Sequence, residues 1–177
     1  IDTSWSRVKG GEKIKEILLK AEKNYDFKNP SASIPALLQA YKAIQTLEDQ
    51  HWKDVKTNEI KVIIQACAGL FLEAVAQDQS ATAGDELIVS LEAINRSKFP
   101  MQLVSYQINP VKEVSNTNKN LTFNKLELFE NLITIPKNAN YTDPYWLKKP
   151  GSIGMYEVND QKNIGKPDVI RDFTVDF

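Results

Sequence analysis

Residues 60–76 read IKVIIQACAGLFLEAVA, and this stretch joins two kinds of hydrophobic pattern. Before Gly69, apolar residues recur every three or four positions, which is typical of one face of an α-helix. After Gly69, the run from Leu70 to Ala76 predicts a β-strand. Glycine readily adopts the left-handed conformation that ends helices, so Gly69 is the expected boundary between the two patterns.

Three amphipathic helices are predicted upstream of Gly69. The second has Ser33 as its expected N-cap and Pro35 in its first turn, where the missing N–H of proline costs nothing. The apolar stripes of the three helices comprise, in order, Ile14, Ile17, Leu18, Ala21 and Tyr25; Ile34, Leu37, Leu38, Tyr41, Ile44 and Leu47; and Val55, Ile60, Ile63, Ile64 and Cys67. Because the connections are short, we expect an antiparallel three-helix bundle over residues 1–69.

Strands without intervening helices are predicted downstream of Gly69. Apolar residues recur at every second position from Leu87 to Ala93, which is the period of a strand. Further strands are expected over 101–108 and 169–177, with one or two more within 123–135. A turn is expected at 83–85 and a loop over 112–120. Several strands at this spacing are typical of an immunoglobulin- or fibronectin-like antiparallel sandwich, expected over residues 70–177. The predicted fold class is therefore α+β.

The composition is that of an ordinary globular chain. Of its 177 residues, 42% are hydrophobic and 25% are charged, and 22 basic residues nearly balance 23 acidic residues. Recognition of duplex nucleic acid needs a clustered positive field, so no nucleic-acid partner is expected. No stretch approaches the roughly 18 apolar residues that a membrane span requires, so no membrane-spanning segment is expected.

The residue types that usually carry catalysis are scarce. The chain has one histidine, His51, and one cysteine, Cys67. A zinc site needs several converging ligands, so His51 is expected to be an ordinary residue at a helix start. Cys67 lies on an apolar stripe, where a thiol is expected to be buried and unreactive. No Gly-x-Ser-x-Gly motif or phosphate-binding glycine pattern occurs. We therefore expect no catalytic residue, metal ligand or cofactor site in this chain.

The segment from Asn140 to Gly151 combines aromatic residues with prolines. Tyr141, Tyr145 and Trp146 offer faces for stacking against a sugar or for contact with a partner. The alternative is that these rings plug one end of the sandwich core. Near the start of the chain, Trp5 is expected to dock the leading segment onto the helices or to contact a neighbouring domain. These four aromatic residues are the candidate glycan or interdomain contacts.

Two groups of motifs look familiar in combination. The first comprises Asp2–Val8, Asn29-Pro30, Ser33–Leu38 and Ala66–Ala74, and the second comprises Asp143–Leu147, Pro150-Gly151, Gly154–Tyr156 and Asp160-Gln161. In this order, and over nearly the whole chain, they resemble the region that follows the catalytic domain in large bacterial PIG-L (LmbE-like) deacetylases, especially those of Bacteroidetes.

The resemblance implies that catalysis belongs to another part of a parent protein. Members of this family use a zinc ion to hydrolyse the N-acetyl group of N-acetylglucosamine-type sugars. Their ligands come from an Ala-His-Pro-Asp-Asp-type motif and a later His-x-x-His, and neither motif occurs here. No catalytic or metal-binding residue can therefore be assigned to this chain, and the zinc ion is expected in the absent catalytic domain.

The expected function is that of a non-catalytic accessory module that packs on the catalytic domain of the same polypeptide and positions it. A carbohydrate-binding sandwich is the alternative, and an independent hydrolase with a scattered carboxylate pair is a third hypothesis. Long members of the family look like exported proteins, so an extracytoplasmic bacterial location is expected. The start without methionine and the end at Phe177 are expected to be cut points in a longer chain.

Overall fold

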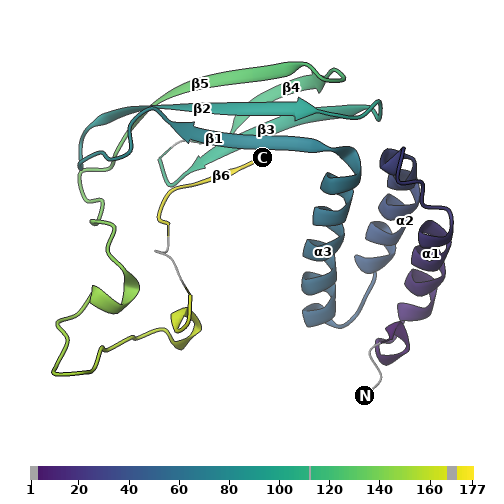
Figure 1. Cartoon of the computed structure of the whole chain (residues 1–177), viewed down its shortest axis with the longest axis horizontal. Coiled ribbons are helices and arrows are strands. Elements are labelled where there is room, and N and C mark those ends of the chain that lie inside the picture. Colours follow the sequence, from purple (N-terminus) through teal and green to yellow (C-terminus); the bar gives the residue numbers. More distant parts are fainter. Residues whose placement is uncertain (1–3, 112, 167–170) are drawn as a thin grey trace. The chain divides into compact units, whose positions relative to one another are not determined.

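The protein consists of helices followed by two antiparallel sheets in a computed structural model that describes residues 4–111, 113–166 and 171–177 (Figure 1). The helices are α1 (Gly11–Lys23), α2 (Ile34–Ile44) and α3 (Gln50–Ala68), and the strands are β1 (Leu70–Ala76), β2 (Glu86–Asn95), β3 (Met101–Asn109), β4 (Ser115–Leu121), β5 (Leu126–Thr134) and β6 (Thr174–Asp176). Short 3-10 turns span Trp5–Arg7, Pro30–Ser33, Tyr145–Leu147 and Gln161–Asn163. The predicted α+β class and the order of helices before strands are confirmed.

The helices share one hydrophobic core, in which α2 packs against both α1 and α3. Its buried members are Val8, Ile14, Ala40, Ile44, Leu47 and Ile60. Burial of an isoleucine or leucine side chain contributes about 1.5–3 kcal/mol, so this cluster is the main contribution that holds the helices together.

Three residues of the predicted apolar stripes are exposed. Tyr25 is 52% exposed because α1 ends at Lys23 and this tyrosine lies beyond the helix. Ile63 is 47% exposed, and Leu38 is also exposed. The side chains of Ile63 and Leu38 lie at the edge of the apolar stripe of their helix. The few elements that pack nearby leave this edge uncovered.

Helix ends follow the local sequence with one exception. The Asp49 carboxylate caps α3 by accepting a hydrogen bond from the backbone N–H of Trp52 at 3.1 Å. Gly69 ends α3 in the left-handed conformation, with φ of 58°, as predicted. Ser33 stands at the N-cap position of α2 but its side chain makes no capping hydrogen bond. Ser33 itself has helical backbone angles because the Pro30–Ser33 turn precedes it, so its hydroxyl is not aimed at the first turn.

Alanine at position 69 is expected to destabilise the protein. The left-handed backbone costs an L-residue about 1–2 kcal/mol, and the new Cβ would lie 3.1 Å from Cβ of Arg96. Gly154→Ala is a matched control, because Gly154 has φ of 79° and nothing within 4 Å of an added Cβ. Urea denaturation should show the larger loss of unfolding free energy for Gly69→Ala. An equal loss in both variants would contradict the close contact with Arg96.

The strands form two three-stranded sheets, with the orders β1-β2-β5 and β4-β3-β6. The antiparallel register of β3 and β6 pairs Gln107 with Asp176 and Asn109 with Thr174. Alternate residues of β2 are buried, as the period of two predicts. A second core cluster contains Val89, Leu91, Tyr106, Ile108, Ile133 and Ile135.

Two strand predictions need correction, and a third is confirmed. The predicted loop over 112–120 contains β4, which has no apolar alternation because it is a polar edge strand paired only with β3. The hydroxyl of Thr117 also donates a hydrogen bond to the carbonyl oxygen of Leu103 at 2.7 Å. Of the one or two strands predicted within 123–135, the structure has one, β5, which confirms that prediction. The strand expected over 169–177 is limited to β6, and positions 169 and 170 lie outside the described residues.

The described residues divide into two compact units. Unit 1 lies within Ile1–Glu73, Glu92–Gln102 and Asn120–Leu128, and unit 2 within Ala74–Leu91, Leu103–Lys119 and Phe129–Phe177. Each strand from β1 to β5 contributes residues to both units. The domain division into residues 1–69 and 70–177 remains a prediction.

Candidate functional site

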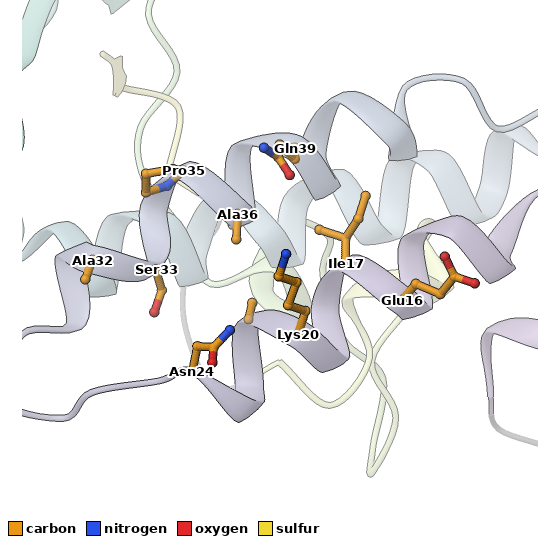
Figure 2. A pocket seen from close by; sticks show the side chains of 10 residues that line it. Glu16, Ile17, Lys20, Asn24, Ala32, Ser33, Pro35, Ala36 and Gln39 are labelled. Atoms are coloured by element: carbon orange, nitrogen blue, oxygen red, sulfur yellow. The ribbon is translucent and has the colours of Figure 1, made fainter.

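A polar hollow of about 480 Å³ lies between α1 and the start of α2 in unit 1 (Figure 2). Ile17 and the small side chains of Ala21 and Ala36 make its apolar part, and the polar residues around it are Glu16, Lys20, Asn24, Ser33 and Gln39. Figure 2 shows Lys20 and Gln39 extending toward one another from the two helices. The hollow thus combines hydrogen-bond donors and acceptors with an apolar surface to which Ala32 and Pro35 also contribute.

Ser33 has an unusual place in this hollow. The residue is only 8% exposed, and its hydroxyl makes no cap with α2. The hollow contains no histidine, and its ionisable residues are Glu16 and Lys20. The Ser33 hydroxyl adds a hydrogen-bond donor and acceptor to this hollow.

Sequence patterns did not identify the polar hollow. Glu16 and Lys20 are four residues apart on α1, a spacing that is typical of a solvent-exposed helix face. Gln39 joins them only because α2 packs beside α1. No short motif in the sequence signals this juxtaposition.

An apolar hollow of about 300 Å³ adjoins the polar one and shares Ala21 and Ser33 with it. Its walls include Leu18 of α1 and Tyr25, which follows α1. Leu37 of α2 and both Ile63 and Cys67 of α3 complete the apolar part of the walls. Desolvation by burial raises the pKa of the Cys67 thiol. A raised pKa lowers the thiolate fraction at neutral pH, so Cys67 is a poor nucleophile. The residue was predicted to be buried, but it is half-buried.

The predicted aromatic contacts fall in both units. In unit 1, Trp5 packs half-buried against the helical core, and the ammonium of Lys56 lies 5.7 Å from its ring centre. Trp5 therefore lies against the helices, and its proposed contact with a neighbouring domain remains a prediction. In unit 2, Tyr145 and Trp146 form an edge-to-face pair with ring centres 4.8 Å apart. The Tyr145 hydroxyl donates to the carbonyl oxygen of Lys166 at 3.3 Å, which fixes that ring.

Tyr141 differs from the other aromatic residues because its ring is 86% exposed. It lines a groove of about 620 Å³ within unit 2, whose apolar wall includes Leu87, Val89 and Phe173. Tyr145 and Trp146 are not among the residues of this groove. Contact of these rings with a glycan or with a neighbouring domain remains a prediction.

His51 occupies the first turn of α3, as predicted, and its ring is edge-to-face with Trp52 at 5.2 Å. Among the described residues there is no cluster of three or more histidine, cysteine, aspartate or glutamate side chains suited to holding a metal ion. Over the same residues, no helix is both long and apolar enough to span a membrane.

Comparison with known proteins gives no relative: no family model matches the chain, and neither the curated proteins nor the solved structures contain a match.

Proposed function

We propose that this chain is a non-catalytic accessory module of a PIG-L-type zinc-dependent deacetylase. In this proposal the helices are an antiparallel bundle that packs on the catalytic domain, and the strands are an immunoglobulin-like sandwich that positions it. The sequence resemblance supplies the family. The structural observation that supports a docking role is the apolar hollow of unit 1, with Tyr25 and Ile63 exposed around it.

This apolar hollow is suited to contact with another protein surface. Leu18, Leu37 and Cys67 supply further apolar wall, so Tyr25 and Ile63 are not isolated exposed residues. Contiguous apolar surface of this kind is typical of interaction sites, whereas single exposed hydrophobic residues are ordinary. Covering a side chain such as Ile63 contributes up to about 1.5–3 kcal/mol to association.

The proposal assigns the chemistry to the partner domain. The zinc ion and its ligands belong to the catalytic domain, and this chain supplies no cofactor or catalytic residue. The parent is extracytoplasmic, and the partner of this chain is the catalytic domain of the same polypeptide. Neither nucleic acid nor a membrane is part of the proposed interaction.

Hydrogen exchange tests the docking role in the full-length parent polypeptide. Backbone amides of α1 and α3 near Tyr25 and Ile63 should exchange more slowly in the parent than in the isolated chain, because the catalytic domain covers them. Ile63→Ser should remove this extra protection, whereas Val104→Ser, at an exposed position of β3, should leave it unchanged. Equal exchange in the parent and the isolated chain would contradict the proposal.

A carbohydrate-binding role is the second candidate, and the exposure of Tyr141 above an apolar groove favours it. Tyrosine rings stack on the apolar faces of sugars, and Asn140 and Thr142 beside it offer polar groups. Soluble N-acetylglucosamine oligomers should then change the tryptophan fluorescence, with Trp146→Ala and Tyr141→Ala as comparison variants. Absence of saturable binding by calorimetry removes this candidate.

A further inference from the structure

Unit 1 contains a cleft of about 720 Å³ that belongs to neither hollow described above, although it borders them. One wall is the segment 28–31 before α2, and another wall is the turn 96–100 after β2. The end of α3, Ala66–Ala68, and its C-cap Gly69 also line the cleft. We call this region the basic cleft, because Lys28, Arg96 and Lys98 line it and no aspartate or glutamate does.

A buried asparagine holds the wall that carries Arg96 and Lys98. The side-chain amide of Asn95 donates to the carbonyl oxygens of Phe99 at 2.9 Å and Leu121 at 3.1 Å. Its carbonyl oxygen accepts from the backbone N–H of Ser97 at 2.9 Å and from the Ser97 hydroxyl at 3.0 Å. Four hydrogen bonds from one side chain fix the backbone of the turn, so its two cations are carried on a rigid support.

Arg96 is further restrained by its neighbours. Its backbone N–H donates to the carbonyl oxygen of Gly69 at 3.2 Å, where the absence of a side chain permits close approach. Its guanidinium lies over the ring of Phe71, 4.9 Å from the ring centre. Such a cation–π contact holds the charge without neutralising it, so the guanidinium keeps its capacity to bind an anion.

The opposite wall is also ordered by local hydrogen bonds. The carboxylate of Asp26 accepts from the backbone N–H of Lys28 at 2.9 Å. The hydroxyl of Ser31 donates to the side-chain oxygen of Asn29 at 2.9 Å. Asp26 is the acidic residue closest in sequence to Lys28, but it does not line the cleft. Lys28 therefore adds a third positive charge from a separate chain segment.

The three cations have no ion-pair partner among the residues that the structure describes. Like charges that converge around one cleft repel each other, and an anion between them relieves that repulsion. Hydrogen bonds between charged groups are stronger than neutral ones, and guanidinium groups bind oxyanions in a bidentate manner. Phe99 and Phe123 add apolar surface beside the charges.

We propose that the basic cleft is a binding site for a small anionic ligand that carries phosphate or carboxylate oxyanions. The ligand lies between the two walls, with Arg96 and Lys98 on one side and Lys28 on the other. This inference goes beyond the docking role and does not depend on it, because none of the three cations lines the apolar hollow.

Calorimetric titration of the whole chain with tripolyphosphate at low ionic strength tests the site. Saturable binding of one tripolyphosphate per chain is expected. Arg96→Gln should weaken it by at least about tenfold, since a hydrogen bond to a charged group is lost. Lys28→Gln, on the other wall, should weaken it several-fold, and Lys42→Gln on α2 is the matched control that should bind like the wild type. Added salt should weaken binding because it screens the charges.

A second titration with citrate separates the two ligand classes. Binding of both anions supports a site for compact polyanions in general, and binding of tripolyphosphate alone supports a phosphate site. Arg96→Lys retains the charge and should recover part of the affinity, which distinguishes lost binding from a damaged fold. The proposal is overturned if no titration saturates, if Arg96→Gln and Lys28→Gln bind like the wild type, or if Lys42→Gln weakens binding equally.

Discussion

Replacement of Asn95 by alanine is expected to lower the free energy of unfolding by about 3 kcal/mol, because a satisfied buried polar network is lost. Asn95 is 1% exposed and its side chain makes four hydrogen bonds, to Ser97, Phe99 and Leu121. Without the amide, the carbonyl oxygens of Phe99 and Leu121 lose a donor. A buried acceptor that is left unsatisfied costs roughly 1–3 kcal/mol.

Urea denaturation followed by circular dichroism measures this change. The matched control is Asn58→Ala, because Asn58 is an exposed residue of α3 that has no side-chain hydrogen bond in the structure. The control should stay within about 0.5 kcal/mol of the wild type. If Asn95→Ala loses as little as Asn58→Ala, the buried network does not stabilise the turn after β2.

The second large effect is expected for Leu91→Ala in the core cluster of the strands. Leu91 is fully buried in the middle of β2 and packs in the cluster with Tyr106 and Ile133. Leucine-to-alanine changes at such sites remove apolar burial and leave a cavity, which together cost about 2–5 kcal/mol. We expect a loss of about 3 kcal/mol in unfolding free energy.

Leu132→Ala is the control for this change, because Leu132 lies on β5 with its side chain exposed. Its loss should be below about 1 kcal/mol, since little apolar surface returns to water. Equal losses for the two variants in urea denaturation would show that Leu91 is not part of a close-packed core.

Local sequence determined much of this fold. The helix that ends at Gly69 and the alternating strand through Leu91 were predicted because each carries a strong period and a clear boundary residue. β4 was missed because an edge strand with both faces mostly exposed needs no apolar alternation. Its pairing with β3 comes from the backbone, which sequence periodicity does not report.

Candidate sites were harder to predict than the elements. The packing of Trp5 on the helices followed from its position and size. The basic cleft did not, because Lys28 and Arg96 are far apart in sequence and meet only through the fold. The composition did not indicate the basic cleft either. Basic and acidic residues are nearly equal in number over the whole chain, and such a total does not report a local group of cations.

We propose that this chain serves a reaction whose chemistry resides in another domain. The direct test is to dialyse the purified chain against a chelator, restore zinc, and measure both bound zinc and release of acetate from N-acetylglucosamine substrates. We predict far less than one zinc ion per chain and no turnover. Retention of one zinc ion per chain together with deacetylation would contradict the claim.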